Sequence, residues 1–442
     1  MKTRFSFFHT MIGIFSLLVF TAGAVLTGCS LFSGSPQDPL QASGITLEHD
    51  NPSIQTVSTP QQASPYPFRA QTDNYDSLSS PDARNLYHAM EQQAWGISQE
   101  KHAEGYYSLG QITMDGNVGE EHIRMAVTAF KNDHPEVFWL ANVYSKAYSE
   151  NHTIVRLYSY VSADECARML EQIDQKVQEI LYRLPAGLSE LDREIFLFDE
   201  IASLCTYDTA AAKDSSLWQS YTIYGLLING KAVCEGYART MQLLLSYADM
   251  ECRLMNGEAG GTVHMWNLVR VDGNWYHLDP TWNDETDVPR YDYFNVTDAV
   301  IGKDHTPSVD ITTLPAQQMA DYLNTGHAAY NLPMPACVAD QANYLKQKGV
   351  LISGFTKASE TRVVSALVEA AQNDKPAVYL YIGEGLNYSM AVNKLFNTSP
   401  YQLADYVEQA NRKLDDKHQI RYDRITYILG ENSRGITVRL AY

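Results

Sequence analysis

The segment Thr262–Trp282, with the sequence TVHMWNLVRVDGNWYHLDPTW, constrains the fold more than any other part of the chain. Two runs of alternating apolar and polar residues flank Asp272-Gly273, a dipeptide that is favoured in two-residue type I′ turns. The pattern therefore predicts a β-hairpin in which Val271 pairs with Asn274. Because a two-residue turn fixes the register, the face of the sheet on which each side chain lies follows directly.

This register brings a histidine and a carboxylate onto one face of the hairpin. His264 lies opposite Thr281, and Asp279 becomes its diagonal neighbour. A carboxylate there can accept a hydrogen bond from one ring nitrogen and leave the other free to take a proton. His277 shares this face and is the alternative base, but it lies nearer the turn, so we favour His264. A slip of one residue would separate His264 from Asp279.

A single cysteine stands between a turn and a helical pattern in GKAVCEGYARTMQLLL. Gly230 supplies the turn, and Ala238, Met241 and Leu244 recur at helical spacing, which predicts that a helix begins at or near Cys234. Unpaired N–H groups at a helix N-terminus favour a thiolate and can also stabilise an oxyanion. The alternative interpretation is an inert, buried cysteine.

These residues lie in motifs that resemble those of a known family. GKAVCEGYA, HMWNLV and WYHLDPTWND are similar to the three motifs of the transglutaminase-like superfamily, in the order Cys, His, Asp. Upstream, FDEIASLCTYD and the tyrosine of YTIYGLL are also similar, so the resemblance spans about residues 195–305. It implies an α+β, papain-like thiol fold in which the cysteine-bearing helix packs on an antiparallel sheet.

The resemblance also implies roles for individual residues. Cys234 matches the nucleophile, His264 the general base and acid, and Asp279 the residue that orients the histidine. Ala232 stands where the family commonly has glycine, two positions before the cysteine, and its small side chain should disturb the turn little. The side-chain oxyanion donor varies in the superfamily, and Tyr224 or Trp218 could serve here.

Members of the superfamily transfer acyl groups from glutamine side chains or hydrolyse peptide and amide bonds through a cysteine thioester. We expect a peptidase or amidase rather than a cross-linker, acting on a protein or peptide such as cell-wall peptide; cleavage of glycan-linked asparagine is a further option. The alternative is a non-catalytic surface lipoprotein that binds peptide or glycan. Tyr224, Trp266 and Trp282 are candidate substrate contacts, although ordinary packing explains each tryptophan equally well.

No cofactor or metal is expected. An acidic cluster follows the hairpin and is better explained as a solvated loop than as a cation site: Asp284, Glu285 and Asp287. The formal net charge of −19 repels phosphate backbones and argues against nucleic acid as a partner.

The first residues predict export and lipidation. Lys2 and Arg4 precede an apolar run over residues 11–25, which is short for a membrane-spanning helix and typical of a signal peptide. LTGC, residues 26–29, resembles the bacterial lipobox, which implies that Cys29 carries lipid and anchors the chain to the extracytoplasmic face of the cell membrane. The alternative is an uncleaved membrane anchor.

Six cysteines occur, and lipidation of Cys29 leaves an odd number, which marks Cys234 as a candidate free thiol. Cys205 lies at helical spacing on an apolar face, so it is expected in the core. The pairing of the other four in disulfides, or its absence, stays open: Cys166, Cys205, Cys252 and Cys337.

Composition and periodicity divide the chain into five parts. We predict a signal peptide at 1–28, a Ser-, Gln- and Pro-rich disordered tether at 29–81, an extension of helices and strands at 82–186, the transglutaminase-like domain at 187–330 and a small α/β domain at 341–442. In the extension, Ser162 and Glu165 form a capping-box pattern ahead of a long helix.

Overall fold

A computed structural model describes residues 45–48, 69, 71–102, 105–149, 151–282, 288–324 and 330–442. The chain forms two compact units. The first comprises the described residues within 1–188, 204–265 and 306–334, and the second those within 189–203, 266–305 and 335–442. The mixture of helices and mostly antiparallel sheets confirms the predicted α+β class, whereas the predicted domain boundaries stay predictions.

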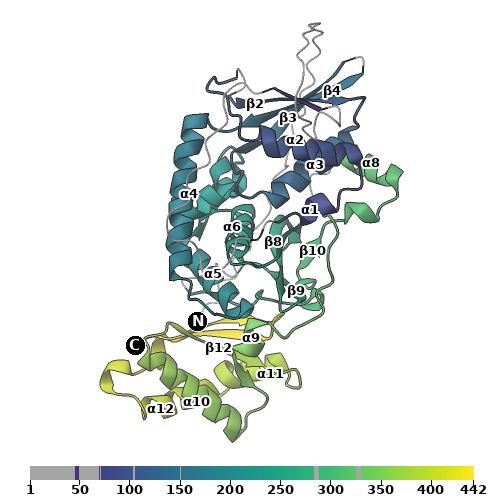
Figure 1. Ribbon diagram of the computed structural model, residues 1–442. Helices are drawn as coiled ribbons and strands as arrows, with labels where there is room; N and C mark the ends of the chain where they lie inside the picture. Colours follow the sequence, from purple (N-terminus) through teal and green to yellow (C-terminus); the bar gives the residue numbers. More distant parts are fainter. Residues whose placement is uncertain are drawn as a thin grey trace. The chain divides into compact units, whose positions relative to one another are not determined.

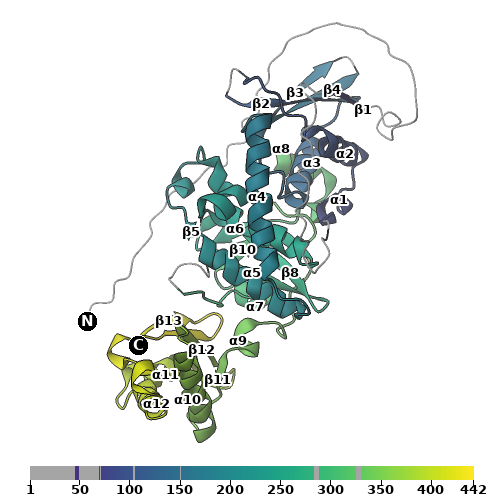
Figure 2. The ribbon, with the colours of Figure 1, turned by 60° about the vertical axis from the view of Figure 1, so that its left-hand side comes forward.

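The first unit begins with a four-stranded sheet of order β1-β2-β4-β3, covered by helices α2 and α3. Figures 1 and 2 both show α2 and α3 side by side against this sheet. The bounds are β1 (Ile45–Glu48), α1 (Asp73–Asp76), α2 (Pro81–Gln93), β2 (Tyr107–Asp115), α3 (Glu120–Asp133), β3 (Leu140–Ser149) and β4 (His152–Ser159).

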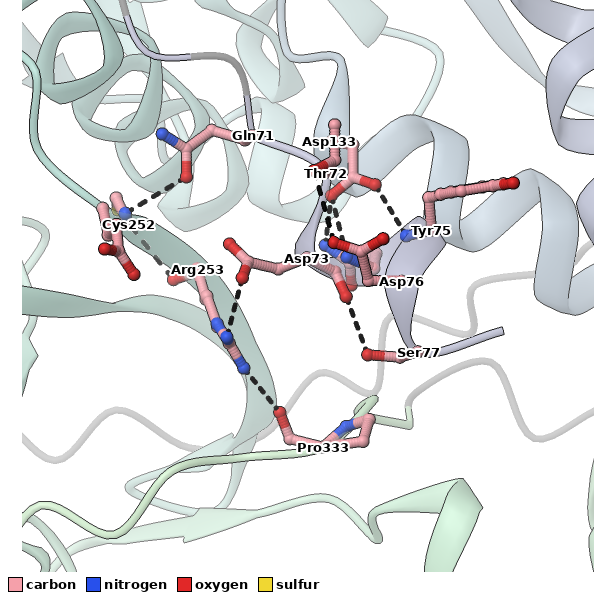
Figure 3. Close-up of polar contacts among 12 residues, drawn as sticks. Gln71, Thr72, Asp73, Tyr75, Asp76, Ser77, Asp133, Cys252, Arg253 and Pro333 are labelled. Carbon is pink, nitrogen blue, oxygen red and sulfur yellow. Dashed lines mark hydrogen bonds and ion pairs between the residues drawn. The ribbon is translucent and has the colours of Figure 1, made fainter. Parts of the chain in front are cut away.

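Ordered structure starts earlier than the predicted end of the tether at residue 81. The backbone N–H groups of Asn74 and Tyr75 donate to the Asp133 carboxylate at 3.1 and 2.9 Å, and Arg253 Nη2 donates to Asp73 Oδ1 at 2.7 Å (Figure 3). These partners come from α3 and from a later strand. The composition of the segment could not reveal them, because each contact joins residues far apart in the sequence.

Helix α4 (Ala163–Arg183) follows the predicted cap. The Ser162 hydroxyl accepts a hydrogen bond from the backbone N–H of Glu165 at 3.3 Å, which satisfies one donor of the first turn. Among the described residues, we find no helix that combines the length and the apolar character needed to cross a bilayer. The predicted signal peptide and Cys29 lie outside the described residues.

Helix α6 (Cys234–Tyr247) packs on strands that follow it, as the resemblance implies. Ala238 of α6 contacts Leu254 of β7 (Cys252–Ala259) and Met265 of β8 in one buried cluster. These strands belong to a four-stranded sheet of order β10-β7-β8-β9. Short elements precede α6: β5 (Thr206–Tyr207), 3₁₀ turns at Ala211–Lys213 and Trp218–Tyr221, a π-helix (Gly225–Asn229) and β6 (Lys231–Ala232).

The hairpin of β8 (Thr262–Val271) and β9 (Asn274–Leu278) has the predicted register. Val271 pairs with Asn274, and the ladder continues to Asn267 and Leu278. Asp272 and Gly273 both have positive φ, 48° and 81°, as a type I′ turn requires. The face assigned to each side chain of this hairpin is therefore confirmed from residue 267 to residue 278.

The second unit contains a sheet of order β11-β12-β14-β13 with helices packed against it. Leu367 of α10, Tyr406 of α12 and Leu380 of β12 are buried in the same core. The bounds are α5 (Glu190–Leu204), α7 (Asp298–Ile301), α9 (Tyr344–Gln347), β11 (Val350–Ile352), α10 (Lys357–Gln372), β12 (Ala377–Ile382), α11 (Tyr388–Val392), α12 (Gln402–Asn411), β13 (Thr426–Gly430) and β14 (Gly435–Arg439). Helix α8 (Ala316–Asn324) belongs to the first unit, and β10 (His305–Pro307) begins at the last residue of the segment 266–305.

Helix α5 carries a buried carboxyl, Glu194, in the second unit. Its Oε2 accepts from Asn295 Nδ2 at 2.6 Å, while Glu194 Oε1 and Asn295 Oδ1 are both buried without a hydrogen-bond partner. Burial raises the pKa of Glu194 to about 8, although the hydrogen bond from Asn295 opposes the shift. The protonated carboxyl would supply the donor that these two oxygens lack.

We expect Glu194→Gln to stabilise the protein at alkaline pH. The folded state keeps this proton to a higher pH than the unfolded state does. The stability that the neutral carboxyl contributes is therefore present at low pH. It is lost as the pH rises from 4.5 to about 8. The free energy of unfolding at the alkaline end should rise by on the order of 2–4 kcal/mol in the variant. Urea titrations at several pH values measure it; Glu369→Gln, at a side chain 69% exposed, is the control. Equal pH profiles for Glu194→Gln and the parent would contradict the assignment.

Candidate active site

Cys234 is the first residue of α6, and its side chain is partly exposed. The preceding residue, Val233, occupies the N-cap position in an extended conformation and has no polar side chain with which to cap the helix. The first backbone N–H groups of α6 are therefore left without an intrahelical partner beside the sulfur. This confirms the predicted helix start and gives the thiol the surroundings of an anion site.

The start of α6 is held against a loop by two close approaches. Val233 N–H donates to the Ser220 carbonyl at 2.9 Å, and the Ser220 hydroxyl donates to Asp208 Oδ2 at 2.7 Å. A Cβ on Gly236 would lie 2.6 Å from the Ser220 carbonyl oxygen and 2.9 Å from Ala232 Cβ. Glycine at position 236 therefore allows α6 to lie this close to the loop. The methyl group of Ala232 leaves no space for a second methyl group there.

The substitution Gly236→Ala should therefore displace the first turn of α6. We expect the free energy of unfolding to fall by about 2 kcal/mol, as for an over-packed core site, and the alkylation rate of Cys234 to fall with it. Chemical denaturation and intact-mass labelling measure the two effects. Gly385→Ala is the matched control, because a Cβ there meets no described atom within 4 Å. A Gly236→Ala protein as stable and reactive as the control would refute this role.

His264 lies on β8 in the first unit and is 6% exposed. It follows Val263, which is 52% exposed, so the strand changes from a solvent-facing to a buried position at the histidine. The first unit therefore contains both Cys234 and His264.

Asp279 directly follows β9 in the second unit and is fully buried. Its Oδ1 accepts from the backbone N–H groups of Thr281 at 2.9 Å and Trp282 at 3.3 Å. These bonds fix the carboxylate within its own turn. A buried carboxylate with this many donors is held in one orientation, which is what a histidine-orienting residue requires.

His305 is a second partner of Asp279 that sequence reasoning missed. Its Nε2 lies 3.1 Å from Asp279 Oδ2, its Nδ1 lies 2.6 Å from Asp304 Oδ1, and its ring is within 5.2 Å of those of Trp266, Trp282 and Tyr293. No motif marks this histidine in the sequence. Only its place after the hairpin, near the carboxylate in space, reveals it.

His277, the alternative base, is engaged at both ring nitrogens. Trp266 Nε1 donates to its Nδ1 at 3.0 Å, and its Nε2 lies 2.8 Å from Asp298 Oδ1. Since Nδ1 accepts from the indole, Nε2 carries the proton and donates to Asp298. Burial lowers the pKa of His277, although the nearby carboxylate opposes the shift. Both ring nitrogens of His277 are thus engaged in hydrogen bonds, which agrees with the preference for His264 as the base.

His277, Asp298 and Cys337 offer ligand atoms within 4.8 Å of one another. The hydrogen bonds argue against a metal, because the proton on His277 Nε2 is donated to Asp298 and the Cys337 N–H donates to Asp298 Oδ2 at 3.0 Å. Burial raises the pKa of the Cys337 thiol to about 12, which disfavours the thiolate that a metal needs. We interpret the group as a structural hydrogen-bond network.

The predicted substrate contacts and the candidate oxyanion donors have different surroundings. Trp266 is 0% exposed and bonded to His277, so it corresponds to the packing alternative rather than to a substrate wall. Trp282 is partly buried against Tyr293. The Tyr224 hydroxyl donates to Gln172 Oε1 at 2.9 Å. Trp218 stacks on Tyr160 with ring centroids 4.6 Å apart.

The acidic cluster at residues 284, 285 and 287 lies outside the described residues.

All five cysteines within the described part of the chain are free thiols, so no disulfide forms among them. Four are buried and only Cys234 is partly exposed: Cys166, Cys205, Cys252 and Cys337 are the buried ones. The core position predicted for Cys205 is confirmed. Burial also raises the pKa of Cys166 well above its usual range.

Comparison with known proteins agrees with the motifs. Residues 184–280 match the family model of the transglutaminase-like superfamily, which confirms the predicted resemblance. The chain is 26% identical over 122 residues to the human kyphoscoliosis peptidase, covering 25% of this chain and 18% of that protein. The mouse kyphoscoliosis peptidase is 23% identical over 171 residues, covering 32% and 26%. The chain thus spans only about a quarter or less of the length of these relatives.

A solved structure described as a TGase covers 36% of this chain and 49% of its own, with 16% identity and a TM-score of 0.25.

Proposed function

Because residues 184–280 match the transglutaminase-like superfamily, we propose that the protein is a thiol enzyme in which Cys234, His264 and Asp279 act together on amide bonds. One observation carries this proposal: a partly exposed cysteine begins a long helix that no side chain caps. That position supplies both the activated sulfur and the donors for an oxyanion.

The hairpin supports the grouping of the other two residues. If the register of the hairpin is continued by one residue beyond the observed pair of Asn267 and Leu278, Trp266 would face Asp279. His264 precedes Trp266 by two residues on the same strand, and alternate residues of a strand share a face. His264 is therefore expected beside Asp279, with the carboxylate held ready by Thr281 and Trp282.

The proposed reaction uses these groups in order. His264 takes the thiol proton of Cys234, and the thiolate attacks an amide carbonyl carbon. The resulting oxyanion accepts hydrogen bonds from the first N–H groups of α6. His264 then protonates the departing amine, which leaves a thioester on Cys234. Water, deprotonated by the same imidazole, hydrolyses the thioester and returns the free thiol.

We propose hydrolysis of peptide or amide bonds rather than transfer to an amine. The protein would act at the extracytoplasmic face of the membrane, held there by lipid on Cys29. This placement rests on the signal and lipobox pattern at the start of the sequence.

A panel of peptides, glutamine donors with a labelled amine, and cell-wall fragments tests the reaction class. Mass spectrometry of the products should show new carboxyl termini and little amine incorporation, and Cys234→Ala should remove the activity. Predominant amine incorporation would make the protein a cross-linker. If no substrate turns over while ligands bind equally to the parent and to Cys234→Ala, the domain is a binding module instead.

A further inference from the structure

The first unit contains a cavity of about 800 Å³ beside the start of α6. Glu235, the residue after the proposed nucleophile, lines it, together with Arg239 one turn further along the helix. Tyr221 and Thr222 contribute from the loop that supports the start of α6. Cavities of this size bind small molecules and side chains of peptides. Because Glu235 follows Cys234 in the chain, the cavity is a candidate subsite for a substrate residue near the attacked bond.

Two regions of the sequence build this cavity. One wall comes from residues 212–239, inside the segment that matches the family model, and the other from residues 101–143 and Tyr160, outside that segment. The strands and helices of the N-terminal extension therefore shape what can enter. Any substrate specificity that this wall provides is therefore a property of this chain, because the wall lies outside the segment that matches the family model.

Aromatic rings form part of the wall. Tyr160 and Trp218 stack with centroids 4.6 Å apart and planes 7° from parallel, and Tyr106 lies 5.9 Å from Tyr160. Phe138 completes the apolar surface. Such a surface can pack against the backbone and the methylene groups of a peptide, but it does not by itself select a side chain.

The charged side chains that line the cavity discriminate between ligands more strongly than the aromatic rings do. Four cationic side chains line the cavity against a single carboxylate, Glu235, in a chain whose net charge is −19; the cations are Lys101, Lys131, Lys213 and Arg239. Arg239 is already paired, since its Nε donates to Glu235 Oε1 at 2.8 Å. The lysines are therefore the cations available to a ligand.

Lys131 is the most informative of them. Its ammonium donates to the neutral amide oxygen of Asn142, and Glu235, which also lines the cavity, interacts with it electrostatically. Burial lowers the pKa of Lys131 to about 8, so the side chain is still largely charged at neutral pH. Glu235 is already paired with Arg239, so among the described residues the desolvated ammonium has only a neutral hydrogen-bond acceptor, and an anionic ligand would offset the cost of its burial.

We propose that this cavity binds an acidic side chain of the substrate, with Lys131 as the group that recognises its carboxylate, next to the amide bond that Cys234 attacks. The assignment rests on the proposed thiol-enzyme function, because it treats the cavity as a subsite of that reaction. The expected substrates are peptides with glutamate or aspartate near the scissile bond.

Binding of two labelled alanine-based hexapeptides tests the proposal, one with a central glutamate and one with glutamine in its place. The full chain carrying Cys234→Ala is used so that turnover cannot occur, and fluorescence anisotropy gives each Kd. We expect the glutamate peptide to bind at least about tenfold more tightly, the effect of one hydrogen bond to a charged group.

Two further substitutions test the role of Lys131. Lys131→Met should remove the preference, and Asn142→Asp should do the same by giving the ammonium a carboxylate within the protein. Lys357→Met, at a side chain 80% exposed in the second unit, should retain the preference. Equal affinity for the two peptides, no binding of either, or a preference that survives both Lys131→Met and Asn142→Asp overturns the proposal. Thiol reactivity and turnover are measured separately, so these outcomes leave the proposed function standing, and a failure of turnover leaves the binding result interpretable.

Discussion

Cys234→Ala is expected to lower the rate of amide hydrolysis by a factor on the order of 10⁴ or more, because removing the nucleophile of a cysteine or serine hydrolase leaves only the contribution of binding and of the oxyanion donors. The fold should be retained, since the side chain is only partly buried and alanine is favoured in helices. The rate of product formation, measured by mass spectrometry on any substrate that the parent hydrolyses, gives the factor directly.

Cys205→Ala is the matched control for this prediction. It removes another free thiol of the first unit, which is 4% exposed in the core. The variant should lose some stability and keep the activity of the remaining folded protein. If Cys205→Ala abolishes hydrolysis while Cys234→Ala retains it, the nucleophile has been assigned to the wrong residue.

The second large effect concerns Asp279. Asp279→Ala should lower the free energy of unfolding by about 3 kcal/mol, because it leaves the backbone N–H groups of Thr281 and Trp282, as well as His305, without a buried acceptor. Asp279→Asn keeps an acceptor for the two N–H groups and should be much more stable. It should still hydrolyse more slowly by a factor on the order of 10³–10⁴, since an amide cannot stabilise an imidazolium.

The contrast between alanine and asparagine separates support of the fold from orientation of the base. Asp298→Asn is the control: Asp298 contacts His277, the other histidine of the hairpin, and its side chain is 52% exposed. It should change activity by no more than a few-fold. Full activity in a folded Asp279→Asn protein would exclude the orienting role, whatever Asp279→Ala does to stability.

Local patterns predicted the elements that carry the proposed chemistry. The Asp272-Gly273 turn determined the hairpin register, and the spacing of Ala238, Met241 and Leu244 placed the start of α6 at Cys234. The cap at Ser162 was equally readable. Each of these features depends on residues a few positions apart, for which turn geometry and helical periodicity are sufficient guides.

Contacts between distant residues were not predictable in this way. His305 lies outside the three motifs, yet its ring contacts Asp279. Asp133 orders the residues around Asn74, which composition alone assigned to a tether. The indole of Trp266 is buried against His277, although alternation alone allowed it to face a substrate. The wall of the cavity from residues 101–143 lies outside every motif. In each case, the residues that lie together become known only once the fold is known.

The most direct test of the central claim is the alkylation rate of Cys234 with iodoacetamide at about pH 6, measured by intact mass in native protein and in denaturant. An imidazole that holds the sulfur as a thiolate should make the native thiol react at least about tenfold faster than the unfolded one, since the thiolate is the reactive form. His264→Ala should return the native rate to the unfolded value. A native rate no higher than the denatured rate, or one that His264→Ala leaves unchanged, would contradict the account of Cys234 as an activated nucleophile.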